Sequence, residues 1–131
     1  MATWTGTIFN DTYTGTSAAD SLDGAGGDDS INGGDGFDTI LGGFGSDTLN
    51  GDGGDDSIDG GLDSDTINGG NGNDILRGGG SLHSDRIDGG AGDDQIFGDA
   101  GDDFLFGGSG FNTVSGGSGN DRIEGGNFSW E

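Results

Sequence analysis

Aspartate recurs along most of this chain at intervals of nine residues, and an aspartate carboxylate is a hard oxygen ligand. The aspartates in this register are Asp11, Asp20, Asp29, Asp38, Asp47, Asp56, Asp65, Asp74, Asp85, Asp94, Asp103 and Asp121, and Asn112 takes the same place once. Carboxylates brought together at such regular spacing repel one another unless a cation lies between them. The pattern therefore indicates cation binding through oxygen.

The types of ligand in the chain narrow the choice of cation. There is no cysteine and only one histidine, His83, so thiolate and imidazole sites are excluded. Glycines precede each aspartate, and glycine permits positive φ, which lets backbone carbonyls turn toward one point. Six to eight oxygens from carboxylates and carbonyls, in a flexible geometry, favour calcium over magnesium.

Composition and charge point the same way. The 131 residues include 35 glycines, no proline and 27% apolar residues, with a formal net charge of −22. Without bound cations this is the composition of a disordered chain. Such a polyanion repels nucleic acid and anionic membrane surfaces, which leaves cations as the expected partner class. No apolar run approaches the ~20 residues of a membrane span.

The elements that position these aspartates form a repeat of nine residues, which we number as places 1 to 9. Thirteen units cover residues 6–124, with aspartate at place 6, and the unit 78–88 has eleven residues. Place 8 is apolar in every unit: Tyr13, Leu22, Ile31, Ile40, Leu49, Ile58, Ile67, Leu76, Ile87, Ile96, Leu105, Val114 and Ile123. Frequent glycines exclude helices. Each unit is predicted to be a six-residue turn followed by a three-residue strand at places 7–9, stacked into a solenoid.

The pattern G-G-x-G-x-D-x-U-x, where U is aliphatic, is intact at 33–41, 42–50, 69–77, 89–97 and 116–124. It resembles the RTX (repeats-in-toxin) calcium-binding nonapeptide. The resemblance implies an all-β fold, a right-handed parallel β-roll with two nonapeptides per coil. About six coils are expected, with calcium between stacked turns. One turn would give its carbonyls from places 2 and 4 and its place-6 carboxylate. The turn two units on would give carbonyls from places 1 and 3 and its own carboxylate.

The resemblance assigns candidate ligands by their place in the repeat. The four best-defined sites combine Gly34, Gly36 and Asp38 with Gly51, Gly53 and Asp56; Gly43, Gly45 and Asp47 with Gly60, Leu62 and Asp65; Gly70, Gly72 and Asp74 with Gly89, Ala91 and Asp94; and Gly101 and Asp103 with Gly116, Ser118 and Asp121. Further turns contribute Gly90, Gly92, Asp29, Asp85 and Asn112, the last as an oxygen ligand without charge. Roughly 7–9 calcium ions are expected in all.

The units differ in quality along the chain. Residues 1–23 contain degenerate repeats that lack glycine at places 2 and 4, and are expected to form an N-terminal cap. Residues 24–124 are expected to form the calcium-binding roll, in which the insertion at 78–88 distorts one turn without breaking the stack. Residues 125–131 are expected to be a C-terminal cap or tail.

Several outward or terminal residues could contact a partner. Ile75, Phe97, Phe104 and Phe106 are predicted to be outward, either as ordinary exposed residues or as a contact surface. The ends of a solenoid must be covered. Trp4, Phe9 and Tyr13 at one end and Phe128 and Trp130 at the other could be caps, or contacts in head-to-tail self-association.

The resulting hypothesis is a non-catalytic structural or assembly module that folds when it binds calcium outside the cell. The resemblance implies type I secretion and an extracellular or cell-surface setting, and MATWTGTIFN has no basic residue or apolar run of a conventional signal peptide. Two alternatives remain open: a folding and secretion module of a larger enzyme or toxin, and a polysaccharide-associated accessory. An ice-binding ladder of Thr39, Thr48, Thr66 and Thr113 is disfavoured because Ile75, Arg86, Phe104 and Arg122 interrupt it.

Overall fold

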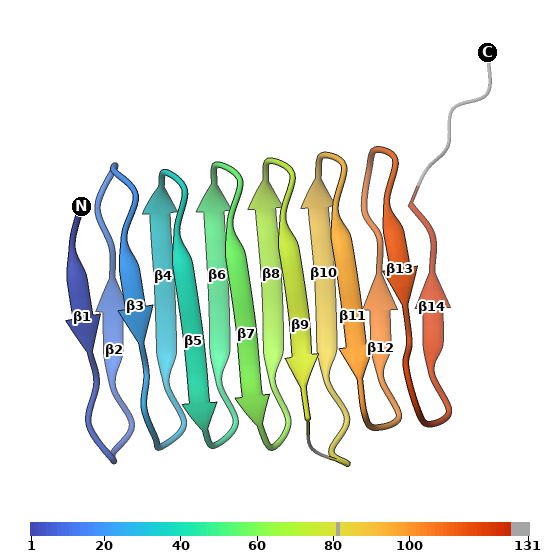
Figure 1. The fold of residues 1–131 in the computed structure, drawn as a ribbon, viewed down its shortest axis with the longest axis horizontal. Helices are drawn as coiled ribbons and strands as arrows, with labels where there is room; N and C mark the ends of the chain where they lie inside the picture. Colours follow the sequence, from blue (N-terminus) through green and yellow to red (C-terminus); the bar gives the residue numbers. More distant parts are fainter. Residues whose placement is uncertain (81, 127–131) are drawn as a thin grey trace.

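The computed structural model describes residues 1–80 and 82–126, which form a parallel β-solenoid (Figure 1). Within these residues there are fourteen strands and no helix, and hence no helix with the length and apolar character needed to span a membrane. The strands are β1 (Thr3–Thr5), β2 (Thr12–Thr14), β3 (Ser21–Asp23), β4 (Ser30–Asp35), β5 (Thr39–Phe44), β6 (Thr48–Gly53), β7 (Ser57–Leu62), β8 (Thr66–Asn71), β9 (Ile75–Gly79), β10 (Arg86–Ala91), β11 (Gln95–Asp99), β12 (Phe104–Phe106), β13 (Thr113–Ser115) and β14 (Arg122–Glu124).

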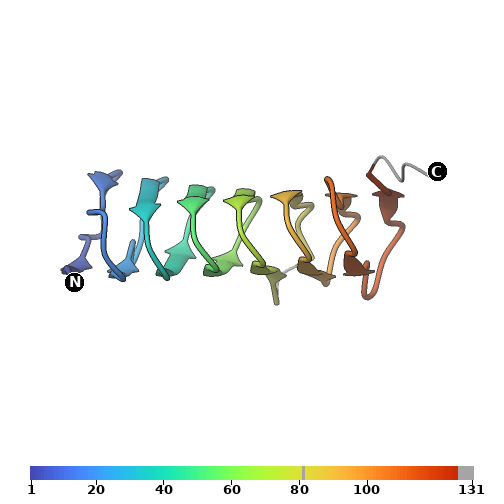
Figure 2. The same ribbon diagram turned by 90° about the horizontal axis from the view of Figure 1, so that it is seen from above.

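The strands form two parallel sheets on opposite sides of the solenoid (Figure 2). The odd sheet has the order β1-β3-β5-β7-β9-β11-β13, and the even sheet has the order β14-β12-β10-β8-β6-β4-β2. Paired residues are two units apart in sequence, as in Leu22 with Ile40. The prediction of an all-β parallel roll with two nonapeptides per coil is confirmed. There are about seven coils instead of six, because Thr3–Thr5 adds β1 before the first unit that the repeat reveals.

The place-8 side chains form one continuous core between the sheets, as predicted. Ten of them are at most 1% exposed: Leu22, Ile31, Ile40, Leu49, Ile58, Ile67, Leu76, Ile87, Ile96 and Leu105. At the N-terminal end Trp4 stacks on Tyr13, with ring centroids 4.7 Å apart, and both rings pack against the core. Phe9, by contrast, is 71% exposed and covers nothing there. Phe128 and Trp130 lie outside the described residues.

The strands of the central coils are longer than predicted. In β4 to β8 and in β10 each strand has six residues and continues from places 7–9 into places 1–3 of the next unit. The reason is a second set of backbone hydrogen bonds: the Phe44 N–H donates to the Ala25 carbonyl at 3.2 Å, and the Gly54 N–H donates to the Asn71 carbonyl at 2.8 Å. The turn is therefore reduced to places 4–6 in these coils.

The two extra residues of the 78–88 unit leave the stack intact. Strand β10 pairs with β8 on one side and β12 on the other, with Ile87 opposite Ile67 and Leu105. The Asp65 N–H donates to Asp85 Oδ1 at 2.8 Å across the insertion. Leu82, inside the insertion, is exposed. The register resumes because the extra length is accommodated in the turn.

Ile75, Phe97, Phe104 and Phe106, which were predicted to be outward, are divided between the two sheets. Ile75 and Phe97 belong to the odd sheet, whereas Phe104 and Phe106 belong to the even sheet. The three phenylalanines are only partly exposed. Guanidinium groups cover two of the rings: Arg77 lies 4.5 Å from the centroid of Phe97, and Arg86 lies 4.8 Å from that of Phe104. Neighbouring units alternate between sheets, which also divides the threonines: Thr39 and Thr113 lie on one sheet, Thr48 and Thr66 on the other.

The continuous core predicts that stability depends on coil position. Replacing the buried Ile58 of a central coil with alanine should lower the free energy of unfolding by about 2–5 kcal/mol, because it leaves a cavity. Replacing Ile123, which is 49% exposed at the last described strand, should cost much less. Chemical denaturation of both variants in saturating calcium measures the difference, and equal losses would contradict a core that is closed in the middle and open at this end.

Candidate metal centre

Two columns of carboxylates run along the solenoid, one beside each sheet, because place 6 directly precedes each strand. From Asp20 to Asp103 these side chains are buried, with exposures between 1 and 3%. Each Oδ1 accepts the place-6 N–H of the preceding coil, as in the chain from the Asp38 N–H to Asp56 Oδ1 and from the Asp56 N–H to Asp74 Oδ1, both 2.8 Å. One oxygen of each carboxylate is thus part of the backbone scaffold.

The second oxygen of these carboxylates has a different environment. Within the described part of the chain, the buried Oδ2 atoms without a hydrogen-bond partner are those of Asp29, Asp38, Asp47, Asp56, Asp65, Asp74, Asp94 and Asp103. A buried charged oxygen without a partner costs several kcal/mol in folding free energy. A row of such atoms is accounted for if a cation supplies the missing partner.

Backbone carbonyls converge on the same region. A Cβ on the place-1 glycine Gly51 would lie less than 3.0 Å from both Asp56 Oδ2 and the Gly69 carbonyl of the next coil. The strand pairing skips this place, since Asn50 pairs with Asn68 and the next pair is Asp52 with Gly70. The Asp56 carboxylate oxygen and the Gly69 carbonyl oxygen therefore line a space that only glycine at place 1 leaves open. Such oxygen ligands suit a hard cation.

This arrangement corrects the reason for glycine at place 1. We expected positive φ at places 1, 2 and 4, but the positive values fall at places 2 and 4, as at Gly34 (99°) and Gly36 (133°). Place 1 needs glycine because a side chain would fill the oxygen-lined space. At place 2, Ala25, Asp52 and Asp99 adopt positive φ without being glycine.

Place 4 directs a third set of oxygens toward the next coil. The carbonyl of Gly36 lies where a Cβ on Gly54 would stand, and the carbonyl of Gly54 lies likewise below Gly72. Place-3 carbonyls accept backbone hydrogen bonds instead, as the Gly53 carbonyl does from the Gly36 N–H at 2.6 Å. The gap between stacked turns is thus lined by place-1 and place-4 carbonyls and by carboxylates. Among the described residues no three His, Cys, Asp or Glu side chains cluster into a site of their own, so carbonyls must complete any ligand set.

Burial alters the acidity of the columns. Desolvation, partly offset by the backbone hydrogen bond to Oδ1, raises the pKa of Asp56 and of Asp65 to about 7. The same cause raises the pKa of Asp47, Asp85 and Asp94 to about 6. Neighbouring carboxylates add to the rise in each case. Without a cation, burial therefore moves the titration of these carboxyl groups toward neutral pH.

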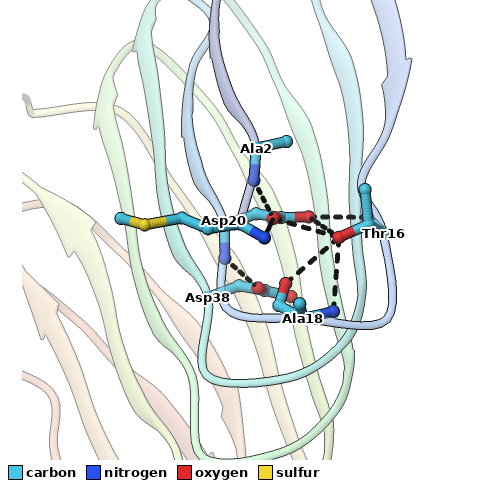
Figure 3. A network of polar contacts seen from close by, with 6 residues as sticks. Ala2, Thr16, Ala18, Asp20 and Asp38 are labelled. Carbon is cyan, nitrogen blue, oxygen red and sulfur yellow. Dashed lines mark hydrogen bonds and ion pairs between the residues drawn. The ribbon is translucent and has the colours of Figure 1, made fainter.

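The first two units satisfy their aspartates differently, which the sequence did not reveal. In Figure 3 the Thr16 N–H donates to Asp20 Oδ2 at 2.6 Å and the Thr16 hydroxyl donates to the same atom at 2.9 Å, while the Ala2 N–H donates to Oδ1. Thr7 binds Asp11 Oδ2 in the same way, through its N–H at 2.6 Å and its hydroxyl at 2.9 Å. The Ala2 hydrogen bond, with those from Thr16, lowers the pKa of Asp20. The available signal was threonine at place 2, next to the place-1 glycine.

Asn112 also differs from its expected role. Its Oδ1 accepts the Asp94 N–H at 2.8 Å, so its nitrogen must point the other way, where it donates to the Gly107 carbonyl at 2.5 Å. The nitrogen thus takes the place of the partnerless Oδ2 of the aspartates. Asn112 keeps the scaffold hydrogen bond but presents a donor, not an oxygen ligand, to the turn.

The triplet His83, Ser84 and Asp85 does not form a catalytic arrangement. Nδ1 of His83 lies 3.7 Å from Asp63 Oδ1 in the preceding coil of the same column. Asp85 is buried in the carboxylate column, where its Oδ1 accepts the Asp65 N–H. The carbonyl of His83 instead occupies the place-4 position below Gly101. This residue therefore continues the repeat across the insertion.

Comparison with known families agrees with this geometry. The family model of the RTX calcium-binding nonapeptide repeat matches residues 5–40, 32–67, 41–76, 79–114 and 102–129. No curated protein matches the chain as a relative. The matches cover nearly the whole chain and coincide with the stacked turns that carry the buried aspartates. The chain therefore belongs to the family of RTX calcium-binding nonapeptide-repeat proteins, whose repeats bind calcium.

Proposed function

We propose that this protein is a structural module that folds when calcium binds between its stacked turns. The observation that carries the proposal is the row of buried Oδ2 atoms without a hydrogen-bond partner. In the unfolded chain these carboxylates are hydrated and repel one another. Calcium ions would neutralise them, so that the free energy of metal binding becomes free energy of folding.

Each ion would lie between two turns of one column. The first turn would contribute carbonyls of places 2 and 4 and its carboxylate, and the turn two units on would contribute its place-1 carbonyl and its carboxylate. The sites proposed for the central coils are those of Gly34, Gly36, Asp38, Gly51, Gly53 and Asp56; of Gly43, Gly45, Asp47, Gly60, Leu62 and Asp65; of Gly70, Gly72, Asp74, Gly89, Ala91 and Asp94; and of Gly101, Asp103, Gly116, Ser118 and Asp121. The place-3 carbonyls of Gly53, Ala91 and Ser118 would have to exchange a backbone hydrogen bond for the ion, whereas the corresponding Gly45 N–H donates to Asp63 Oδ2.

The proposed number of ions is the number of gaps between stacked turns in which both place-6 side chains can still offer a ligand oxygen. The gaps bordered by the threonine-satisfied Asp11 and Asp20, and the gap bordered by Asn112, are unsuited to calcium. Three gaps beside the odd sheet and five beside the even sheet remain. About eight ions are therefore proposed, within the range expected for repeats of this kind, and they would offset most of the formal charge of −22.

The proposed setting is outside the cell, by type I export. RTX repeats are typical of secreted proteins, and calcium is far more abundant outside cells than inside. A chain that stays unfolded until it meets calcium would keep its carboxylates hydrated during export. This role holds equally for a module that acts alone and for one that folds at the end of a larger secreted protein.

Calcium should switch the chain from coil to β-structure, and the switch should depend on Oδ2. In Asp56→Asn the amide oxygen can still accept the Asp38 N–H, as Asn112 does for Asp94, but a nitrogen replaces the ligand oxygen. Losing a charged ligand costs about 1.5–3 kcal/mol, so the calcium midpoint should rise roughly tenfold or more. Far-ultraviolet circular dichroism during calcium titration measures this midpoint.

Asp35→Asn is the matched control, since it removes the same charge from an exposed place-3 residue of the same region. Its midpoint should stay close to that of the unaltered chain, and magnesium should not replace calcium in either. A chain that is fully folded in chelator, or two variants with the same midpoint, would refute calcium-driven folding through these oxygens.

The pH dependence should have opposite signs with and without calcium. The pKa of Asp56 and Asp65 is raised from 3.8 to about 7 in the folded chain, so the ion-free fold binds protons more tightly than the unfolded chain does. The stability that these two carboxyl groups contribute is fully present below about pH 4 and is lost as the pH rises through about 7. With calcium, protons compete for the same oxygens, and the calcium midpoint should rise as the pH falls.

Circular dichroism in calcium-free buffer between pH 4 and 8 tests the first half of this prediction, and calcium titrations at several pH values test the second. Sedimentation velocity on the same samples separates folding from precipitation near the isoelectric point. A β-signal that grows with pH in the absence of calcium would show that burial of the carboxylates does not oppose folding.

A further inference from the structure

Two outward triplets on opposite sheets match each other in spacing and are opposite in charge. On the odd sheet Asp23, Leu41 and Asp59 occupy place 9 of β3, β5 and β7, and the strand pairing holds them in register. On the even sheet Arg86, Phe104 and Arg122 occupy place 7 of β10, β12 and β14 in the same way. Each triplet crosses three adjacent coils, so each has the same spacing of about 4.8 Å between neighbours.

The acidic triplet borders an apolar groove. Leu41 is 44% exposed between the two carboxylates, and Phe44 and Leu62 beside it are also exposed. The floor of the groove carries no side chain at Gly43 and Gly61, the place-2 residues of β5 and β7, and only the methyl group of Ala25 beside them. Asp23 Oδ1 accepts the Ala25 N–H at 3.0 Å, which fixes its carboxylate at the end of the groove.

The basic triplet is held outward by stacking. The guanidinium groups of Arg86 and Arg122 lie 4.8 and 5.3 Å from the ring centroid of Phe104, one from each neighbouring strand. Arg122 also donates to Glu124 Oε1. Arg86 and Arg122 are two of the three arginines in a chain that has no lysine and a formal charge of −22. Asp88 and Glu124 lie at place 9 of the same strands, so the two arginines make this face locally neutral in a strongly acidic chain.

We propose that a second copy of this chain docks here, with the basic triplet of one copy against the acidic triplet of the other. Arg86 and Arg122 would pair with Asp23 and Asp59, and Phe104 would lie on Leu41. Each triplet has one charged residue on either side of its apolar residue. The same three contacts therefore form whether the axes of the two solenoids are parallel or antiparallel. When the facing strands run the same way, Phe106 lies opposite the groove between Leu41 and Phe44.

In this contact the solenoids lie side by side. The assembly can keep growing, because each copy binds one neighbour through its odd sheet and another through its even sheet. It differs from head-to-tail stacking of the solenoid ends. The proposal rests on the proposed function, since bound calcium must first reduce the repulsion between two acidic chains. The contact is about three strands wide, smaller than a standard stable interface, so association is reversible and concentration-dependent. Added salt weakens it, because its ion pairs lie near the surface.

Charge reversal on each face tests the proposal. The variant Asp23→Arg/Asp59→Arg makes both faces basic, and the variant Arg86→Glu/Arg122→Glu makes both faces acidic. In sedimentation velocity with saturating calcium, the unaltered chain should gain mass with concentration. Each variant alone should associate at least tenfold more weakly, and an equimolar mixture of the two should associate again, because opposite faces then meet.

The variant Thr113→Glu/Ser115→Glu is the control, since it adds negative charge to β13 of the odd sheet outside both triplets, and it should associate like the unaltered chain. Circular dichroism of every sample reports folding separately. Folded chains that stay monomeric at the highest soluble concentration overturn the lateral contact but leave calcium-driven folding intact. Association that neither charge reversal changes, or that mixing does not restore, also overturns it. A chain that fails to fold in calcium overturns the proposed function, and this contact with it.

Discussion

The constraint on which the rest of this structure depends is the burial, in eight turns between Asp29 and Asp103, of an aspartate oxygen that has no hydrogen-bond donor. Asp56 shows the arrangement: Oδ1 accepts a backbone N–H from the preceding coil, and Oδ2 faces the carbonyl of Gly69 across the place-1 glycine. Nothing in a purely protein environment would favour two oxygens at such a place. A divalent cation reverses the sign of the interaction, so the features that destabilise the ion-free chain are those that build the calcium site.

The core explains why the cation is needed for more than charge neutralisation. Each unit contributes one aliphatic side chain, and the buried ones form a single file from Leu22 to Leu105 between the two sheets. Against this stands the ordering of 35 glycines, each with a larger loss of backbone entropy than any other residue. The backbone ladder fixes the geometry, but its hydrogen bonds replace bonds to water and contribute little net free energy. The calcium ions proposed between the turns would supply stability that the core of a small solenoid cannot.

The sequence predicted the features that depend on the nine-residue period and missed those that depend on contacts between neighbouring coils. The period identified the place-8 core, the stacked turns and the carboxylate columns, because each depends on one unit being like the next. It also assigned the place-1 glycine to backbone conformation, whereas the structure shows a need for space beside the carboxylate. Contacts between coils, not local propensity, extend the strands to six residues.

In the units that depart from the repeat, hydrogen-bond donors of the protein take the place that a cation is proposed to take in the others. Thr7 and Thr16 place an N–H and a hydroxyl on the carboxylate oxygens that face a cation elsewhere, and they do so in the first two units. These units lack glycine at places 2 and 4, and a donor from the same unit satisfies the aspartate instead. Asn112 achieves the same result near the other end by changing the acceptor to a donor. Threonine at place 2, or asparagine at place 6, thus removes the partnerless carboxylate oxygen from its turn, whereas Ala25, Asp52 and Asp99 at place 2 leave it in theirs.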